Sequence, residues 1–464
     1  MSDPGLLRLA ERVLLPGFTG PTVPDWLARA ADRGLAGVCV FAPNVGPAIG
    51  ELADRGLLVA SDEEGGSVTR LDHVTGSPWP SAAALGRLDD VTVTEAVGAG
   101  IGTRARAAGV GLVLSPVADV NAAPDNPVIG VRAFGAEPAL VARHTAAFVR
   151  GVQSAGAAAC AKHWPGHGST TVDSHVGLPT VADDLATLTA RDLPPFAAAV
   201  EAGVAAVLTA HVRFPALDDA PATMSPAVLG LLRRELGFTG VIVSDALDMH
   251  AIAHGVGRGP GGVAALAAGV DLLCTGNPAF PDPYDDEAGY LEVRDAVLAA
   301  LVDGTLDRQR VEEAGDRVAR LPVGRAGTDP GNVIVGAEVA RRVLDVVGDV
   351  RVGGGPHVLD LTAGAGVAAG PGRNWLAAAL SPRTEGEGPL VVVAAGPSAE
   401  LAAVRAQRPD AVVVVPGAPD PRWAPEPPVV RLWGSGRVHA EAAAAALVDG
   451  VAAGECVSSN GGST

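Results

Sequence analysis

The chain has 464 residues, more than one ordinary hydrophobic core accommodates, so two domains or a barrel with an appendage are expected. Apolar residues make up 48% of the sequence, yet no uncharged apolar run reaches the roughly 18 residues that a membrane-spanning helix needs. The formal net charge of −18 argues against nucleic acid or an anionic membrane surface as a partner, because both bind basic patches.

The N-terminal segment does not have the pattern of an export signal. Glu11 and Arg12 stand where such a signal has an uninterrupted apolar run, which predicts a cytoplasmic protein. The four cysteines are scattered singly, without the paired spacing of a zinc site or a disulfide framework. We therefore expect no metal and no cofactor, and a small or neutral ligand.

Short apolar runs alternate with amphipathic helical stretches between residues 10 and 280, which is typical of βα units repeated around a parallel sheet. Eight runs occur, the number that a closed (β/α)8 barrel requires. They are Val13 to Phe18, Val38 to Phe41, Leu57 to Ser61, Leu112 to Pro116, Ala157 to Lys162, Ala205 to Thr209, Val241 to Ser244 and Val270 to Thr275. This pattern predicts an α/β fold with a TIM-like barrel over residues 1–322.

Polar side chains follow these runs directly. They are Asn44, Asp62 to Glu64, Asp119, Lys162, His163, His211, Asp245 and Asn277. Because active sites of such barrels lie at the carboxyl ends of the strands, we expect these side chains to converge on one face. Lys162 is the single lysine among 34 basic residues, so its position favours a compact ammonium group over a planar guanidinium.

A change of composition near residue 322 predicts a second unit, a linker and small α/β domain over residues 323–464. The first part is rich in glycine and proline. A helix is expected over Ala337 to Val347, buried strands over Leu390 to Ala394 and Ala411 to Val415, and a helix around His439 to Val448.

The segment AKHWPGHGSTTVDSHVGLP, residues 161–179, carries the densest set of reactive side chains. His163 and His167 have the spacing of a helical metal pair, but Pro165 and Gly166 break the helix that this pair would need. Two solvated or core histidines are the simpler alternative. Asp173 lies two residues before His175, so in an extended segment both side chains point the same way, and the carboxylate fixes the imidazole for acid/base work.

Two further segments supply carboxylates and arginines at strand ends. In GVIVSDALDMHA, Asp245 follows the seventh apolar run and is either a functional carboxylate or the cap of the next helix. In VASDEEGGSVTRL, Asp62 is the first polar residue after a strand and the best placed to reach a ligand hydroxyl. Arg70 and Arg132 can approach the same face and hold a carboxylate or several oxygens, although each arginine alone is more often a surface charge.

Taken in order, DEEGGSVTRL, NPVIGVRAFG, KHWPGHG, DSH and SDALDM resemble family 3 glycoside hydrolases, and within them the β-N-acetylglucosaminidase (NagZ-like) branch. The resemblance spans roughly residues 10 to 320. It implies that Asp245 forms a covalent glycosyl-enzyme and that His175, oriented by Asp173, is the acid/base. It also implies a sugar subsite lined by Asp62, Arg70, Arg132, Lys162, His163 and His211. Ala246 and Trp164 depart from many relatives, which carry an acid and a phenylalanine there.

The resemblance thus predicts a retaining, exo-acting β-N-acetylhexosaminidase that releases terminal β-linked N-acetylglucosamine from a small carbohydrate substrate. Phosphorolysis is an alternative, because an imidazole acid/base does not repel a phosphate acceptor as a carboxylate would. A non-catalytic sugar-binding barrel is an alternative of another class. The aglycone, which includes peptidoglycan-recycling fragments among its candidates, and the oligomeric state are left open by the sequence.

Overall fold

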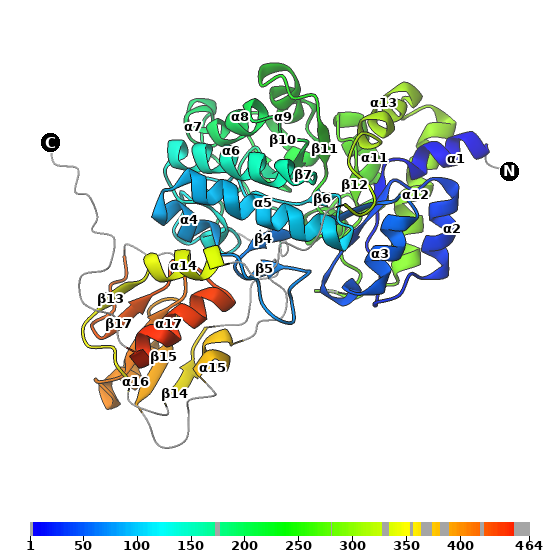
Figure 1. The fold of residues 1–464 in the computed structure, drawn as a ribbon. Coiled ribbons are helices and arrows are strands. Elements are labelled where there is room, and N and C mark those ends of the chain that lie inside the picture. Colours follow the sequence, from blue (N-terminus) through cyan, green and yellow to red (C-terminus); the bar gives the residue numbers. More distant parts are fainter. Residues whose placement is uncertain are drawn as a thin grey trace.

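The computed structural model describes residues 3–171, 177–279, 281–326, 334–352, 356–362, 374–380, 389–417 and 422–449. Its larger domain is built on eight parallel strands in chain order (Figure 1). They are β1 (Leu14–Leu15), β2 (Gly37–Val40), β3 (Leu58–Ser61), β6 (Leu112–Val113), β7 (Ala158–Trp164), β8 (Ala206–Thr209), β11 (Val241–Val243) and β12 (Leu273–Cys274). Each lies within or overlaps one of the eight predicted runs.

Backbone pairing closes these strands into a ring. Six form one ladder in the order β2-β3-β6-β7-β8-β11, and β1 pairs with β12. Cys39 N donates to Pro16 O (2.9 Å) and joins β2 to the end of β1, while a parallel bridge between Val243 and Leu272 joins β11 to β12. The predicted TIM-like barrel is therefore confirmed.

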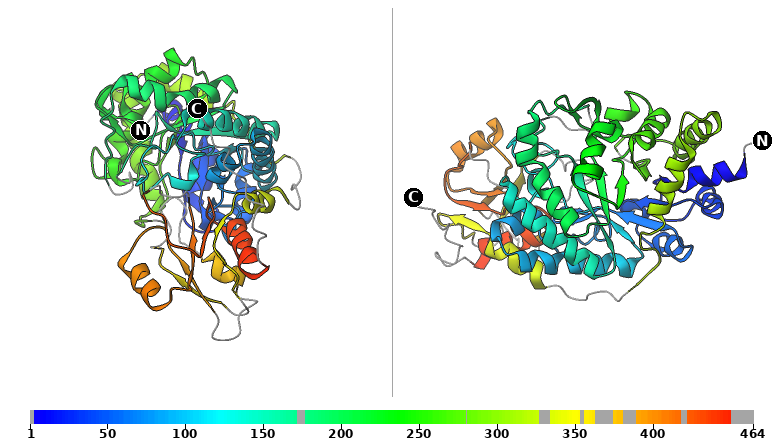
Figure 2. Two further views of the ribbon diagram at one scale, coloured as in Figure 1. Left: turned by 90° about the vertical axis from the view of Figure 1, so that its left-hand side faces the viewer. Right: turned by 90° about the horizontal axis from the view of Figure 1, so that it is seen from above.

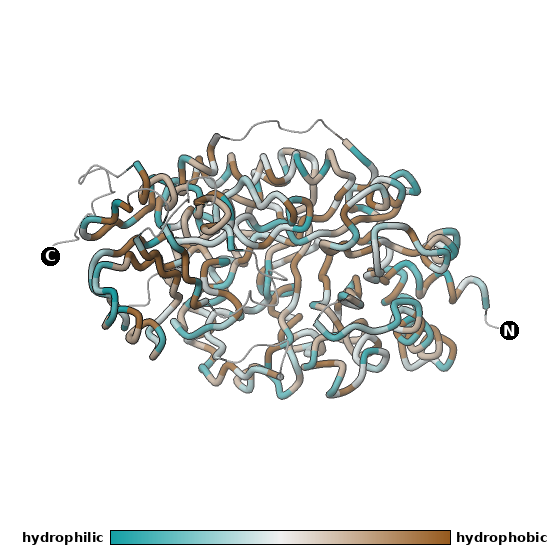
Figure 3. Tube along the Cα trace, turned by 90° about the horizontal axis from the view of Figure 1, so that it is seen from below, coloured by the Kyte–Doolittle hydropathy of each residue, from teal (hydrophilic) through white to brown (hydrophobic). Residues whose placement is uncertain are grey.

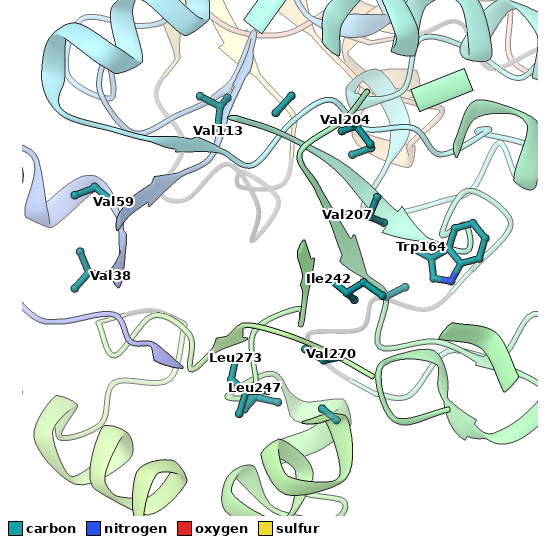
Figure 4. Packing of buried hydrophobic residues seen from close by; sticks show 14 of the residues in the cluster. Val38, Val59, Val113, Trp164, Val204, Val207, Ile242, Leu247, Val270 and Leu273 are labelled. Carbon is teal, nitrogen blue, oxygen red and sulfur yellow. The ribbon is translucent and has the colours of Figure 1, made fainter. Parts of the chain in front are cut away.

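Side chains alternate between the two faces of the barrel wall, as the period of a β-strand requires. One set, which includes Leu58, Ala60 and Leu208, packs inside the ring. The other set faces the surrounding helices and includes Val38, Val59, Val113, Val207, Ile242 and Leu273 (Figure 4). Because both faces are buried, the strands appear in the sequence as continuous apolar runs.

Helices surround the ring (Figure 2). They are α1 (Pro4–Glu11), α2 (Asp25–Arg33), α3 (Pro47–Asp54), α4 (Ala82–Leu88), α5 (Val91–Ala108), α6 (Pro138–Ser154), α7 (Leu185–Arg191), α8 (Leu193–Glu201), α9 (Pro226–Gly230), α10 (His250–Ala253), α11 (Arg258–Ala268), α12 (Asp286–Asp303) and α13 (Arg308–Val318). Two antiparallel pairs lie outside the ring, β4 (Glu63–Gly65) with β5 (Val68–Thr69) and β9 (Arg213–Phe214) with β10 (Asp218–Pro221). The first pair, called here the hairpin, stands at the barrel mouth between β3 and α4.

The C-terminal domain contains a five-stranded sheet in the order β13-β17-β16-β15-β14. Its strands are β13 (Asp345–Val347), β14 (His357–Asp360), β15 (Leu390–Val393), β16 (Val412–Val415) and β17 (Val429–Arg431). The helices are α14 (Ile334–Arg342), α15 (Trp375–Leu380), α16 (Ala399–Gln407) and α17 (Arg437–Asp449). The tube in Figure 3 shows hydrophobic stretches within both domains and hydrophilic segments around their edges.

One predicted element of this domain is wrong. The helix expected over Ala337 to Val347 ends at Arg342, and Asp345–Val347 instead pairs antiparallel with β17. The run Val343 to Val347 contains three valines, whose branched side chains favour a strand when a partner strand is available. The strands predicted at 390–394 and 411–415 and the C-terminal helix are confirmed. The boundary at residue 322 stays a prediction.

The two domains meet at the hairpin. Ser81 N donates to His439 Nε2 (3.0 Å), and Ser435 N donates to Ser81 Oγ (3.1 Å). The hydroxyls of Ser435 and Ser67 lie 2.9 Å apart, and the helix α14 contacts α4 and α5. Among the described residues, no helix combines the length and the apolar character that crossing a membrane requires.

Candidate active site

A cavity of about 980 Å³ opens at the carboxyl ends of the barrel strands and extends to the C-terminal domain. Six of the predicted site residues line it together, although they come from four separate segments of the barrel. They are Asp62, Arg70, Arg132, Lys162, His163 and Asp245. The convergence expected from their positions after strands is therefore observed for these side chains.

Lys162 stands at the centre of a buried ion cluster. Its side chain is only 3% exposed, and its Nζ lies 2.7 Å from Asp62 Oδ1 and 2.6 Å from Glu64 Oε1. Asp62 also accepts from Arg70 Nη2 (3.0 Å), and Glu64 receives two hydrogen bonds of 2.8 Å from Arg132. Each carboxylate is thus held between the ammonium and one guanidinium, which is the arrangement that a buried charge needs.

The electrostatics of the cluster keep all its members charged. Burial alone would raise the pKa of Asp62, but the ammonium of Lys162 and the guanidinium of Arg70 outweigh it and hold that pKa well below its usual range. For Glu64, Arg132 and Lys162 likewise outweigh burial and lower the pKa to about 2. Burial favours the neutral form of Lys162, yet the two carboxylates prevail and raise its pKa.

The hairpin orients these groups through Glu63, whose side chain points the opposite way from those of its two acidic neighbours. Glu63 accepts from Ser61 Oγ (2.8 Å) and Thr69 Oγ1 (2.6 Å), and from the backbone N–H groups of Arg70 and Leu71 (3.0 Å each). This carboxyl group ties the two strands of the hairpin together, and burial raises its pKa. It is a structural group beneath the cavity wall.

His163 is oriented by a buried carboxylate that sequence reasoning did not count among the site residues. Its Nδ1 donates to Asp119 Oδ2 (2.7 Å), while Asp119 Oδ1 accepts from the backbone of His167 (2.7 Å). Burial would raise the pKa of Asp119, but His163 and the other bonds lower it, so it stays ionised and fixes the tautomer of the imidazole. The rings of His163 and His167 pack edge to face, with their centroids 5.8 Å apart.

The possibility that Asp245 is the cap of the next helix does not hold. The residue before α10 is Met249, and no side chain caps that helix. Asp245 Oδ1 accepts from its neighbour Ala246 N (2.8 Å). Asp248 instead accepts from Asn277 N (2.8 Å) and from Tyr284 Oη (3.3 Å), so it joins the loops after β11 and β12.

His211 differs from the other predicted sugar ligands. It is fully buried, its Nε2 donates to the carbonyl oxygen of Ala246 (3.0 Å), and its Nδ1 lies at hydrogen-bond distance from Thr223 Oγ1 (2.8 Å). Among the described residues it is not part of the cavity lining. It supports the backbone that follows Asp245.

The predicted acid/base pair, Asp173 and His175, lies outside the described residues. Sequence reasoning placed Glu64 and Asp119 among the polar residues at the strand ends but assigned neither of them a role in the site. Glu64 had a detectable signal, because residues 62 and 64 share one side of an extended segment and flank the single lysine. Asp119 was noted only as a polar residue after the fourth apolar run.

Comparisons with known proteins agree with this geometry. Residues 52–321 match the family model described as the glycosyl hydrolase family 3 N terminal domain. The chain belongs to glycoside hydrolase family 3. It is accordingly a glycoside hydrolase, and the matched range contains all the cavity residues named above.

Relatives of this family 3 enzyme match different shares of the chain. Over 315 residues it is 37% identical to a β-hexosaminidase of Xylella fastidiosa (strain M23), with 62% of this chain and 90% of that relative covered. It is 33% identical over 283 residues to β-hexosaminidase A of Pseudoalteromonas piscicida, of which it spans only 47%, with 57% of this chain covered. A family 3 β-N-acetylglucosaminidase structure from Paenibacillus sp. str. FPU-7 matches with a TM-score of 0.78 at 27% identity, covering 96% of this chain and 97% of that one.

Proposed function

We propose that this family 3 enzyme is a retaining β-N-acetylhexosaminidase that releases terminal β-linked N-acetylglucosamine. The observation that carries the proposal is that Asp245 lines the same cavity as the cluster of Asp62, Lys162 and Arg132. A carboxylate for attack at the anomeric carbon and a preorganised set of hydroxyl-binding groups thus face one space. The β-hexosaminidase relatives support the N-acetylated glycone.

In the proposed reaction, an oxygen of Asp245 attacks the anomeric carbon while His175, oriented by Asp173, gives its proton to the leaving glycosidic oxygen. A covalent glycosyl ester forms and the aglycone departs. His175, now neutral, takes a proton from water, whose oxygen attacks the same carbon and releases the Asp245 carboxylate. Two inversions give net retention. Asp62, Lys162 and Arg132 hold the sugar hydroxyls, with His163 beside them.

The first test is Asp245→Asn, assayed with a chromogenic N-acetylglucosaminide. We expect the variant to fold normally and to lose nearly all turnover, because the amide is a poor nucleophile. Asp282→Asn is a matched control, since Asp282 is an exposed carboxylate on the rim of the same cavity. Equal loss in both variants, or retained turnover in Asp245→Asn, would overturn the assignment.

The second test concerns His175. Replacement by alanine removes the proton donor, so we expect kcat to fall far more for substrates with basic leaving groups than for activated aryl glycosides. A uniform loss across leaving groups would contradict an acid/base role. The configuration of the first-formed sugar, read by NMR, tests retention independently.

Hydrolysis is favoured over phosphorolysis by the charges of the cavity. Its described lining carries seven carboxylates against four lysine and arginine side chains, and Lys162, Arg70 and Arg132 are already ion-paired. A phosphate acceptor would enter a net negative space with few uncommitted cations. Turnover with and without phosphate, with analysis for a sugar 1-phosphate, distinguishes the two reactions. Sugar binding without any turnover would instead indicate the non-catalytic barrel.

A further inference from the structure

We infer that Asp183, Arg191 and Asp192 form a clamp that positions the acid/base of the proposed reaction by joining the two ends of the segment that carries it. The inference rests on the proposed function, because the segment that precedes Asp183 contains the predicted pair of Asp173 and His175. The clamp itself consists of three described residues, none of which lines the cavity. Its members are therefore positioning residues and do not touch the substrate.

The outgoing end of this segment packs on Asp192. Gly166 has a φ of +147°, and a Cβ atom there would come within 2.9–3.1 Å of the Asp192 side chain, so glycine is what permits the close approach. Just before it, Trp164 packs edge to face on Phe196 of α8, with the ring centroids 5.2 Å apart. Asp192 and Phe196 are four residues apart at the start of this helix and share one of its sides. The backbone that leaves β7 thus rests directly on the Asp192 carboxyl group.

The returning end of the segment is held by Arg191. Its Nη2 donates to Asp183 Oδ2 (2.6 Å) and to Asp192 Oδ2 (2.9 Å), and its Nε donates to the same Asp192 oxygen (3.2 Å). Asp183 is followed by Asp184, whose side chain caps α7, so the guanidinium fixes the point at which the chain enters that helix. One guanidinium–carboxylate pair therefore contacts both ends of the segment.

Ordinary structural roles do not account for the Asp192 carboxyl group. It directly precedes α8, where an aspartate usually caps the helix, yet its side chain makes no capping hydrogen bond. Its side chain is 3% exposed, and burial raises its pKa from 3.8 to about 6. The folded state then binds this proton more tightly than the unfolded chain, so stability falls as the pH rises through that interval. An ionised carboxylate that lowers stability at neutral pH indicates a functional role.

Charged groups from the loop after β6 and from both ends of α7 act on Asp192. Arg191 favours its ionised form, whereas Asp119 and Asp183 disfavour it. Asp119 also accepts from His163 Nδ1 (2.7 Å), so the same pair of carboxyl groups underlies the histidine at the end of β7. When Asp192 is protonated, Arg191 keeps Asp183 as its charged partner and the electrostatic link between the two ends is lost. The clamp is thus complete above about pH 6 and incomplete below it.

The first test compares Arg191→Met with Arg150→Met, a control on α6 whose ion pair with Glu95 is exposed. Two substrates are used, phenyl N-acetyl-β-glucosaminide, whose basic leaving group needs a proton donor, and its 2,4-dinitrophenyl analogue, whose leaving group does not. We expect Arg191→Met to lower kcat/KM for the phenyl substrate about 10- to 100-fold, because a displacement of about 1 Å can cost this much, and to leave that for the dinitrophenyl substrate within about twofold. Arg191→Lys should recover part of the loss, and Arg150→Met should change neither rate.

A second variant, Asp192→Asn, keeps the shape that packs on Gly166 and removes only the charge. For the phenyl substrate, the kcat/KM of the native enzyme should fall below about pH 6, whereas the variant should lack this decline and have at pH 7 the low value that the native enzyme reaches in acid. Because the ionised carboxylate disfavours folding, thermal unfolding at pH 7 should show the variant to be no less stable than the native enzyme. The same acid decline in both proteins, or full activity of the variant at pH 7, would overturn the role of Asp192.

The outcomes separate this inference from the proposed function. If the native enzyme hydrolyses neither substrate, the proposed function fails. If His175→Ala lowers both rates equally, the acid/base assignment fails and the clamp falls with it. If His175→Ala shows the dependence on the leaving group and Arg191→Met affects both substrates equally or neither, the clamp is refuted while the proposed function stands.

Discussion

Replacing Lys162 with methionine tests the ion cluster at the centre of the site. Methionine keeps the length and apolar character of the lysine stem and removes only the ammonium. Asp62 and Glu64 would each lose one of two cations while retaining Arg70 at 3.0 Å and Arg132 at 2.8 Å, respectively. The variant therefore measures what the ammonium contributes beyond the two guanidinium groups.

The size of the expected loss follows from the burial of Asp62 and Glu64 and from the number of cations that remain beside each carboxylate. Breaking a buried ion pair so that one charge is left uncompensated costs about 3–5 kcal/mol. Since each carboxylate keeps an arginine, we expect the free energy of unfolding to fall by about 2–3 kcal/mol, somewhat below that range. A hydrogen bond from a charged group contributes about 1.5–3 kcal/mol, so kcat/KM should fall by about 10- to 150-fold if Lys162 also binds a sugar hydroxyl.

The assays are urea unfolding at pH 7 and hydrolysis of a chromogenic N-acetylglucosaminide. Arg143→Met is the control, because its ion pair with Asp89 is exposed and should contribute no more than about 1 kcal/mol. Lys162→Arg restores the charge but places a wider planar group in a side-chain site that is 3% exposed, so it should recover less stability than its charge suggests. If Lys162→Met has the free energy of unfolding and the kcat/KM of the native enzyme, the ammonium contributes neither to stability nor to turnover.

Three more predictions follow from buried groups around the site. Trp164→Phe should destabilise the barrel by about 1–3 kcal/mol, measured by urea unfolding, because it removes the bond from Nε1 to Val228 O (3.1 Å) and leaves a void. Gly276→Ala should lower both stability and kcat, because the residue has a φ of +110° and a Cβ there would overlap the Asp248 carboxyl group. Burial lowers the pKa of His439 to about 4, so its contribution to stability is complete above about pH 6.5 and is lost as the pH falls toward 4. Thermal unfolding against pH should show this slope, and His439→Gln should reduce it.

The barrel could be predicted because each of its strands is subject to the same local requirement, burial on both faces. A strand buried on both faces must be apolar at consecutive positions, so each predicted run, such as Val241 to Ser244, coincided with an observed strand. Polar residues after several of the runs, such as Asp62, Lys162 and Asp245, then fell at the barrel mouth by geometry alone. Lys162 was predictable for the same reason and for its rarity.

The pairings within the site were less predictable, since they depend on which loops meet. Sequence reasoning expected Arg70 and Arg132 to hold a carboxylate or several oxygens without naming the partner, and the structure shows Arg70 bound to Asp62 and Arg132 bound to Glu64. It named His211 among the sugar ligands, which stays a prediction, and the structure shows that this imidazole also donates to the Ala246 carbonyl. Nothing in the local pattern distinguishes a ligand-facing histidine from one that supports a backbone turn.

The C-terminal wall of the cavity could not be predicted at all, because it requires two segments far apart in the sequence to dock. Ser81 and His439, which join the domains, are separated by 358 positions. Trp375 is one of six tryptophans, and only the docked arrangement places it opposite the barrel mouth. No helix was predicted at Trp375–Leu380, and hydrophobic periodicity says nothing of what the Trp375 side chain faces.

The number of hydrogen-bond donors on an ammonium explains why position 162 is a lysine. An ammonium carries three N–H groups, and Asp62 and Glu64 accept two of them. Among the described residues this leaves one donor for a hydroxyl of the sugar, already charged and already oriented before the sugar binds. An arginine would present its donors in one plane and satisfy the same carboxylates side by side, without directing a further donor between them. Under the proposed function, the cluster would act as a preorganised hydrogen-bond donor whose geometry is maintained by ion pairs, which is the condition under which such a donor contributes most to a reaction.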